Sequence, residues 1–430
     1  MFNRTLRAKL VPICLGMSGA LAMVGAADAS AATLFVSNSA PVVVGGRSCA
    51  QPGFNSIQTA IATGGLGAKI AVCPGTYTEE LTIVRAVKLS AAGGPGTATV
   101  AMPAAPTASS TKCSEGLSEP QLIAVAICTG ETVSITGVDV EAIVPLTACT
   151  DGLYGIFIGG GGTLKATDMA VDGASTSLDE YKGCQHGVAI AAGLKPPTPE
   201  VGHAVLKDVT VSGYEKNGPT VRGAGSTLSV DDSTITGEGP SPWIAQNGIE
   251  VAYGAAGTVK SSTVSGNECD VPVCTTDEEE QATGVLFYGA AAGSGVSSST
   301  LEQNDIGGYY DSTSVSQPEA AEVTFAKDTV ASNRYEGFVL EQGKALLNKD
   351  TIDGGGKVGI DLVQTKEQSL ASQSSAIHTK VEDQTEAAIR VESDKSTEDK
   401  KGSSFVFADG TFSGNGTVLD NESNDFEVVL

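Results

Sequence analysis

The sequence predicts an all-β chain that folds as a single parallel β-helix, a solenoid of short strands, with a short helix before it. Three observations lead to this prediction: one block of residues recurs along the chain, one position of the block is always apolar, and glycine or asparagine often follows it. Repeats of roughly 20 to 50 residues are typical of solenoids, in which each repeat buries its apolar side against its neighbours.

The recurring block is a short strand followed by a turn. Its copies read DMAVDG from 168, DVTVSG from 208, DSTITG from 232, SSTVSGN from 261, SSTLEQN from 298, KDTVASN from 327, KDTIDGG from 349 and DGTFSGN from 409. The apolar position holds Val171, Val211, Ile235, Val264, Leu301, Val330, Ile352 and Phe412. Two residues later, glycine stands at Gly173, Gly213, Gly237, Gly266, Gly354 and Gly414. We expect a buried apolar column and turns at these glycines, which tolerate positive φ.

A second strand, opening on glycine, accompanies many copies of the block. It reads YGIFIG from 154, HGVAIA from 186, NGIEVAYG from 247, TGVLFYG from 283, EGFVLEQG from 336 and VGIDLVQ from 358. Alternation with a period of two disfavours helical repeats, and no strong hairpin signals support a propeller. We expect surface loops near 100–120, 173–203, 267–282 and 364–402.

The first 31 residues have the pattern of a secretory signal peptide. A basic start at Arg4, Arg7 and Lys9 precedes an apolar stretch and an A-x-A cleavage pattern that ends near Ala31. That apolar stretch is too short to be kept as a membrane span, so we expect a secreted, extracellular protein without a membrane span in the mature chain. The predicted divisions are 1–31 signal peptide, 32–65 N-terminal strand and cap helix, and 66–430 parallel β-helix.

The sequence FNSIQTAIATGG, residues 54–65, predicts the cap helix. Phe54, Ile57 and Ile61 form one apolar stripe, and Asn55 is the expected N-cap, with Gln58 three residues later. A helix here would cover the open edge of the first strands, because an uncovered strand edge invites pairing with other chains.

The cysteines predict disulfides. Nine are present, and one of them, Cys14, lies in the predicted signal peptide. An even number in an exported chain favours disulfides over metal binding, and no C-x-x-C pair indicates a zinc or redox site. Among the many possible connectivities we predict pairing in sequential order: Cys49 with Cys73, Cys113 with Cys128, Cys149 with Cys184, and Cys269 with Cys274.

Two segments near the start of the predicted solenoid resemble a known family. Phe54 to Ile61 (F-x-S-I-Q-x-A-I) and Ile70 to Glu79 (I-x-V-x-P-G-T-Y-x-E) are similar to the N-terminal signature of the pectate-lyase-like superfamily of right-handed parallel β-helices. The resemblance implies a single right-handed parallel β-helix, in a superfamily whose members often cleave or modify acidic polysaccharides. None of the family's catalytic motifs matches this sequence, so the catalytic residues are unknown and no cofactor-binding residues are assigned.

One column of carboxylates is a candidate metal site. Asp168, Asp208 and Asp232 occupy the same position of consecutive blocks, and neighbouring parallel strands lie about 4.8 Å apart. Like charges that close repel each other unless a cation intervenes, and calcium is the cation that prefers carboxylate oxygens. The alternative is an exposed row whose side chains diverge into water. Calcium is therefore a possible cofactor, and none is certain.

Trp243 and Arg222 are the candidate substrate-binding residues. Trp243, the only tryptophan, lies in the loop sequence GEGPSPWIAQN, where its ring can stack on a sugar or be buried against the strands beneath. Arg222 is one of only five arginines after the predicted signal peptide. The three histidines are far apart in the sequence and have no metal-ligand spacing, so we interpret them as structural.

Charge narrows the range of partners. The formal net charge is −24, which disfavours nucleic acid and anionic membranes as partners. We therefore expect a polysaccharide or an extracellular protein surface as the partner. The favoured hypothesis is a secreted or cell-surface, non-catalytic protein that presents a long β-face to such a partner. The alternative is a calcium-dependent polysaccharide lyase or glycoside hydrolase that acts on acidic glycans.

Overall fold

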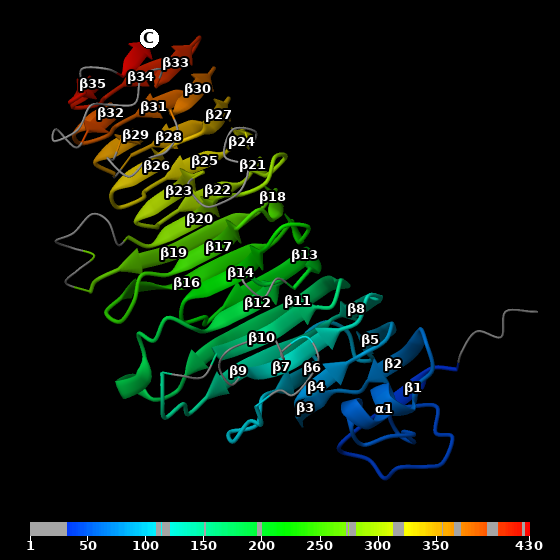
Figure 1. The fold of residues 1–430 in the computed structure, drawn as a ribbon. Coiled ribbons are helices and arrows are strands. Elements are labelled where there is room, and N and C mark those ends of the chain that lie inside the picture. The colour runs from blue at the N-terminus through cyan, green and yellow to red at the C-terminus, as the bar shows by residue number, and fades with distance from the viewer. Residues whose placement is uncertain are drawn as a thin grey trace, which may run out of the picture. The chain divides into compact units, whose positions relative to one another are not determined.

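Short strands separated by sharp corners wind the chain into successive coils, which we call rungs (Figure 1). The structure, a computed structural model, describes residues 32–108, 113, 121–149, 152–195, 200–271, 274, 281–312, 322–354, 356–364, 371–393, 403–423 and 426–430. These residues belong to one compact unit, 32–430. The predicted signal peptide, 1–31, lies outside the described residues.

Each complete rung contributes strands to three parallel ladders, named here sheets I, II and III. The strands of sheet I are β1 (Leu34–Val36), β2 (Ala68–Val72), β5 (Val87–Ala91), β8 (Thr132–Thr136), β11 (Gly162–Thr176), β13 (Gly202–Ser212), β15 (Thr227–Asp231), β18 (Ala256–Lys260), β21 (Gly295–Ser297), β24 (Glu322–Ala326), β27 (Lys344–Asn348), β30 (Gln373–Ile377), β33 (Ser404–Ala408) and β36 (Glu427–Val429).

Sheet II follows sheet I in each rung. Its strands are β3 (Gly75–Thr78), β6 (Ala98–Ala101), β9 (Val138–Val144), β16 (Thr234–Ser241), β19 (Thr263–Cys269), β22 (Thr300–Glu302), β25 (Thr329–Ala331), β28 (Thr351–Asp353), β31 (Lys380–Glu382) and β34 (Thr411–Ser413). The long strands β11 and β13 bend through the corner and belong to both ladders, which joins them into one 24-stranded sheet.

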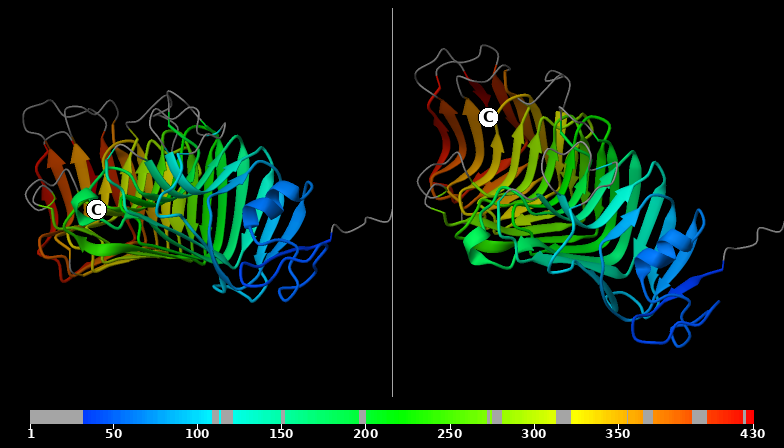
Figure 2. Two further views of the ribbon diagram at one scale, coloured as in Figure 1. Left: turned by 90° about the horizontal axis from the view of Figure 1, so that it is seen from below. Right: turned by 60° about the horizontal axis from the view of Figure 1, so that its bottom comes forward.

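Sheet III has 12 strands and closes each rung. They are β4 (Leu81–Ile83), β7 (Gln121–Cys128), β10 (Gly152–Gly159), β12 (Val188–Ala192), β14 (Asn217–Arg222), β17 (Asn247–Ala252), β20 (Thr283–Tyr288), β23 (Ile306–Asp311), β26 (Glu336–Leu340), β29 (Val358–Gln364), β32 (Ala387–Ser393) and β35 (Thr417–Asn421). Figure 1 labels several of these strands, and Figure 2 shows strands of successive rungs side by side along the stack. The predicted all-β parallel solenoid is confirmed.

The predicted apolar column is confirmed as a stack in sheet II. Each of its members pairs in register with its counterpart on the next rung, except that Val381 of β31 stands between Ile352 and Phe412. The members from Val171 to Ile352 are at most 1% exposed, and Phe412, near the end of the stack, is partly buried. Burial of these side chains is the main stabilising contribution to the fold.

Two corners of each rung require the left-handed backbone conformation. Between sheets I and II, Gly137 holds this corner in the rung of β8 and β9, with φ of 67°. From β11 onward the corner residue has φ between 50° and 64° and is not glycine: Asp168, Asp208, Asp232, Ser261, Ser298, Lys327, Lys349, His378 and Asp409. After sheet II, most of the predicted glycines have positive φ. Gly237 is the exception, because β16 continues past it through an irregularity in the ladder.

Polar side chains point inward just after these corners and form two buried ladders. The first runs through Ser233, Ser262, Ser299, Asp328 and Asp350, each of which accepts the backbone N–H of the equivalent residue on the preceding rung. The second includes Asn267, Asn304 and Asn333, linked by amide hydrogen bonds of 2.8 to 3.2 Å. Such ladders satisfy buried backbone donors that would otherwise destabilise the fold.

The cap helix is α1 (Ile57–Thr63), and the residue that caps it corrects the prediction. Ser56, not Asn55, is the N-cap, and its hydroxyl accepts the N–H of Thr59 at 3.1 Å. The carboxylate of Glu79 accepts the N–H groups of Ile57 and Gln58 at 2.9 and 3.0 Å. The two segments that resemble the family signature thus form one capping unit. Glu79, the last residue of the second segment, accepts hydrogen bonds from the N-terminus of the helix in the first.

All four predicted disulfides are present: Cys49–Cys73, Cys113–Cys128, Cys149–Cys184 and Cys269–Cys274. The expected loop at 364–402 is wrong in its middle, where β30, β31 and β32 make a full rung. The expected loop at 173–203 likewise contains β12. No helix within the described ranges is long and apolar enough to cross a membrane.

Candidate functional site

The outer face of sheet III is unusually polar and yet largely buried. In β17, Ile249 and Val251 point into the solenoid, while Asn247 and Glu250 point outward. An outward side chain of a sheet normally meets water, but Glu250 is only 6% exposed. Surface loops extend beside this face, so its polar groups lie in a sheltered environment where hydrogen bonds and charges act more strongly.

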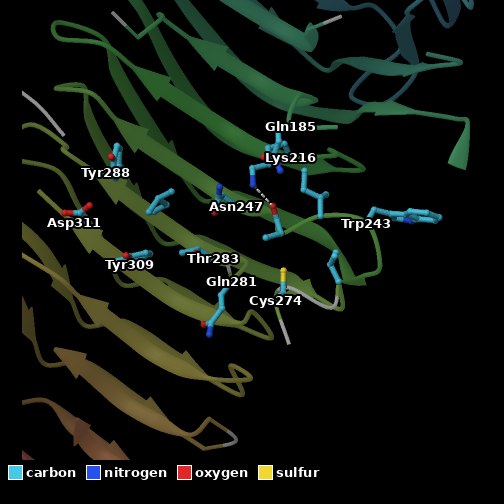
Figure 3. A pocket seen from close by; sticks show the side chains of 14 residues that line it. Gln185, Lys216, Trp243, Asn247, Cys274, Gln281, Thr283, Tyr288, Tyr309 and Asp311 are labelled. Carbon is cyan, nitrogen blue, oxygen red and sulfur yellow. Dashed lines mark hydrogen bonds between the residues drawn. The ribbon is translucent and has the colours of Figure 1, made fainter. Parts of the chain in front are cut away.

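A cavity of about 590 Å³ lies on this face, over β17, β20 and β23. Its volume is within the range of small-molecule sites, roughly 300 to 1,000 Å³. Figure 3 shows Trp243 at one end of the lining residues and Tyr288 and Asp311 at the other. The lining comprises Gln185, Lys216, Trp243, Ile244, Ala245, Asn247, Val271, Cys274, Gln281, Thr283, Leu286, Tyr288, Tyr309 and Asp311.

One wall of the cavity is the loop between β16 and β17, which carries Trp243. The Lys216 ammonium donates to the Ala245 carbonyl at 2.8 Å, and the Gln246 side chain donates to the Tyr214 carbonyl at 2.6 Å. These bonds hold the loop against the rung below. Trp243 is 39% exposed, which leaves part of its ring available to a ligand.

A second wall comes from the loop after β11, which contributes Gln185. Glu215, directly before Lys216, accepts the N–H of Thr176 at 3.3 Å and those of Gly183 and Cys184. Burial raises the pKa of Glu215 to about 7, although these backbone donors lower it in part. The Cys149–Cys184 disulfide constrains the same loop. Residues 215 and 216 therefore anchor two walls of the cavity at once.

The third wall is the segment after β19, which supplies Val271 and Cys274. The Cys269–Cys274 disulfide closes it, and Arg334 bonds Asp270 at 2.7 Å and Asp305 at 2.6 Å. Burial raises the pKa of Asp305 to about 6. Asp305 also accepts the backbone N–H of Cys269 at 3.0 Å, which ties this wall to the next rung.

The far end of the cavity consists of tyrosines and a carboxylate. The Tyr309 hydroxyl donates to Glu341 Oε2 at 2.8 Å, and burial together with this carboxylate raises the pKa of Tyr309. Tyr288 lies in edge contact with Tyr253, with ring centroids 5.6 Å apart. Asp311 is 5% exposed. This end presents phenol hydroxyls and one carboxylate to a ligand.

Arg222, a predicted substrate-binding residue, lies on the same face but is held by a carboxylate. Its Nε and Nη2 donate to the two oxygens of Glu250 at 2.7 and 2.6 Å. Asn217 donates to the same carboxylate at 2.6 Å. Burial alone would raise the pKa of Glu250, but Arg222 lowers it below its usual value. Arg222 therefore sits beside the cavity lining and not in it, whereas Trp243 belongs to the lining.

The predicted metal residues Asp168, Asp208 and Asp232 occupy consecutive left-handed corners on the opposite side of the rungs from sheet III. Lys207 reaches Asp232 at 3.3 Å. Among the described residues, the one group of three ligand-type side chains within 4.8 Å of one another is Cys149, Cys184 and His186, whose cysteines form a disulfide. The three aspartates do not converge to that distance.

Several lining residues were not identified from the sequence. They include Lys216, Tyr288, Tyr309 and Asp311, which supply the two charges of the lining and its phenol hydroxyls. A signal exists for Tyr288, because Leu286 and Tyr288 alternate with the buried Val285 and Phe287 in one strand. Sequence alternation shows that such residues point outward, but only the fold shows which rungs are adjacent and which loops cover them.

Comparisons with known proteins agree with this architecture. A family model described as a right-handed beta helix region matches residues 199–376. A mutant of the periplasmic alginate epimerase AlgG has a similar structure, with a TM-score of 0.56, 11% identity, and coverage of 87% of this chain and 82% of that chain. The catalytic domain of a GH87 α-1,3-glucanase gives a TM-score of 0.48, 10% identity, and coverage of 87% and 66%. No curated protein matches by sequence.

Proposed function

We propose that this right-handed parallel β-helix protein is exported and binds a polysaccharide in the cavity on sheet III. The observation that carries the proposal is the composition of the cavity lining, which combines the aromatic rings of Trp243, Tyr288 and Tyr309 with amide and hydroxyl groups. Sugar rings combine apolar C–H faces with hydroxyl edges, and aromatic side chains with a polar tip match that combination. The cavity is concave and lies on rigid strands, which hold such groups in place.

The likeness to the alginate epimerase supports the proposal only through the fold. That protein is named for action on a polysaccharide, and a shared fold does not transfer the activity. Export is supported by the signal-like first 31 residues and by four disulfides, which form in oxidising compartments. A secreted or cell-surface location gives such a protein access to extracellular glycans.

The proposed role is binding without catalysis. The alternative, a lyase or hydrolase, is favoured by one observation: the Asp311 carboxylate and the Tyr309 hydroxyl both line the cavity, and such groups transfer protons in many enzymes. Incubating the mature protein with polysaccharides, with and without EDTA, separates the two roles. Shorter products that disappear on chelation would establish the calcium-dependent alternative, and unchanged polymer with measurable binding supports the binding role.

The single tryptophan makes the binding test direct. Because Trp243 is the only tryptophan and lines the cavity, its fluorescence reports occupancy there. We expect emission to change as oligosaccharide is added, and affinity measured by calorimetry to fall about tenfold or more in Trp243→Ala and Tyr309→Ala. Lys165→Met, on the exposed outer face of sheet I, serves as the control variant and should bind like the wild type. Equal affinities of all variants would refute the proposed site.

A further inference from the structure

Resting on the proposed function, we infer that the cavity takes uncharged sugars and discriminates against uronic-acid polymers. A uronic-acid polymer carries a negative charge on every unit, and its binding requires cations placed to meet those carboxylates. The inference follows from the positions of the lysine and arginine side chains on the outer face of sheet III and from the groups that they bind.

The cavity lining carries two formal charges among its described residues, Lys216 and Asp311. Lys216 donates to the carbonyl of Ala245 and so supports the wall that carries Trp243. Asp311, at the opposite end, is a carboxylate that is 5% exposed. A ligand that extends along β20 from Thr283 to Tyr288, a length of about 17 Å at ~3.3 Å per residue, meets both ends. Such a length exceeds a single sugar ring.

The arginines of this face are bonded to carboxylates of the protein. Arg222 binds Glu250 through both oxygens. Arg390 of β32 donates to Asp361 and lies 3.5 Å from Glu336, and both carboxylates are at most 4% exposed on their side chains. Moving either guanidinium to a ligand would leave a buried carboxylate without its cation, which is strongly destabilising.

The lysines beside the lining lie over aromatic rings: Lys182 Nζ is 6.0 Å from the ring centre of Trp243, and Lys195 Nζ is 5.7 Å from that of Tyr253. Two carboxylates lie together at the Tyr309 end of the cavity. At the Tyr309 end, Glu341 accepts a hydrogen bond from the Tyr309 hydroxyl. Asp311, the last residue of β23, lies beside Glu341, which follows the neighbouring strand β26. A uronate placed there meets like charge in a sheltered environment, where charges are poorly screened. The chain as a whole carries −24, which adds a repulsive long-range field.

Neutral sugars meet no such obstacle. The remaining polar groups of the lining, which include Gln185, Asn247, Gln281 and Thr283, are amides and a hydroxyl that both donate and accept hydrogen bonds. Sugar hydroxyls need donors and acceptors of this kind and no charge. These neutral polar groups lose little when they bind a neutral ligand, and they do not repay the desolvation of a charged one.

The test compares neutral and acidic oligosaccharides of equal length on the mature protein. Cellohexaose, maltohexaose and laminarihexaose are the neutral probes, and hexagalacturonate and hexamannuronate are the acidic probes. Each is titrated while the fluorescence of Trp243 is recorded, at low salt, at physiological salt and with added calcium. We expect at least one neutral probe to bind with an affinity that salt leaves unchanged, and the acidic probes to bind at least tenfold more weakly.

A charge variant tests the mechanism of the discrimination. In Asp311→Asn we expect the acidic probes to gain affinity by about tenfold, because one buried like charge is removed. The matched control is Asp353→Asn, which changes an exposed carboxylate on sheet II and should alter nothing. Acidic probes that bind the wild type more tightly than every neutral probe, with or without calcium, would overturn this inference while leaving the proposed function intact. No response to any probe would refute the proposed function itself.

Discussion

Asp328 and Asp350 lie on adjacent rungs inside the solenoid, and Asp350 Oδ1 accepts the backbone N–H of Asp328 at 2.8 Å. Each residue is 1% exposed. On the preceding rungs of the same ladder the equivalent position holds serine, which is uncharged. The ladder therefore changes from hydroxyls to carboxyl groups where two ionisable residues stack on each other.

This pair predicts that stability falls as the pH rises. Burial raises the pKa of Asp328 to about 7, with the charge of Asp350 adding to the effect, and burial raises the pKa of Asp350 to about 6. A carboxyl with a raised pKa in the folded state stabilises the fold fully below its unfolded pKa near 3.8, and this contribution is lost as pH rises through the folded value. For Asp328 the loss amounts to roughly 4 kcal/mol.

Thermal unfolding between pH 5 and pH 8 checks this expectation. The melting temperature of the wild type should decrease across this range, and that of Asp328→Asn should decrease less steeply, whatever its starting value. Asp353→Asn, with an exposed carboxylate, controls for general charge effects. Parallel pH profiles for the wild type and Asp328→Asn would contradict the prediction.

The stacked apolar column predicts a large cost for a buried charge. Ile235→Asp should lower the free energy of unfolding by about 4 kcal/mol or more, because Ile235 is 0% exposed between Val211 and Val264. Thr234→Asp, the adjacent exposed residue of β16, should change it by less than about 1 kcal/mol. Denaturant titration measures both, and comparable losses would show that this column is not the core.

The cap helix predicts a specific role for Glu79. Glu79→Ala removes the acceptor of two helix N–H groups and of the Ser56 hydroxyl, so the free energy of unfolding should fall by about 1 to 3 kcal/mol. Glu80→Ala is the matched control, since among the described residues its carboxylate accepts one exposed backbone N–H, that of Thr107. Local amide exchange in α1 (Ile57–Thr63) should rise in Glu79→Ala alone.

The Arg222–Glu250 pair predicts non-additive mutations. Arg222→Met leaves the Glu250 carboxylate buried without its cation and should cost about 3 to 5 kcal/mol. The double variant Arg222→Met with Glu250→Leu should recover much of that loss, because it replaces a buried ion pair by apolar groups. Denaturant unfolding of the two single variants and the double variant gives the coupling energy. Strictly additive losses would show that the two residues act independently.

The fold was predictable because the sequence repeats its own constraints. The apolar residue of each block, the following glycine and the paired cysteines all restrict the chain to short strands and sharp corners. The rung at 373–393 escaped prediction because its corners use other residues. His378 takes the first corner, where the other blocks have aspartate, serine or lysine, and Asp383 takes the second corner, where most blocks have glycine. Without these residues the block is difficult to identify in the sequence.

The candidate site was only partly predictable. Trp243 stood out as a single aromatic residue in a loop, and it does line the cavity. The cavity itself depends on which strands are neighbours and on three walls that are held by residues such as Glu215 and Arg334. Variable loop lengths between rungs hide these relationships in the sequence, because pairs such as Asp270 and Arg334 are distant along the chain.

The left-handed corners between sheets I and II allow the sequences of such chains to diverge. These positions demand a backbone conformation, and here aspartate, serine, lysine and histidine all adopt it. Surface residues at such bends can therefore be exchanged over generations with little effect on the coil beneath, while only the inward residues must be retained. That tolerance helps to explain how two proteins can share an architecture at 11% identity.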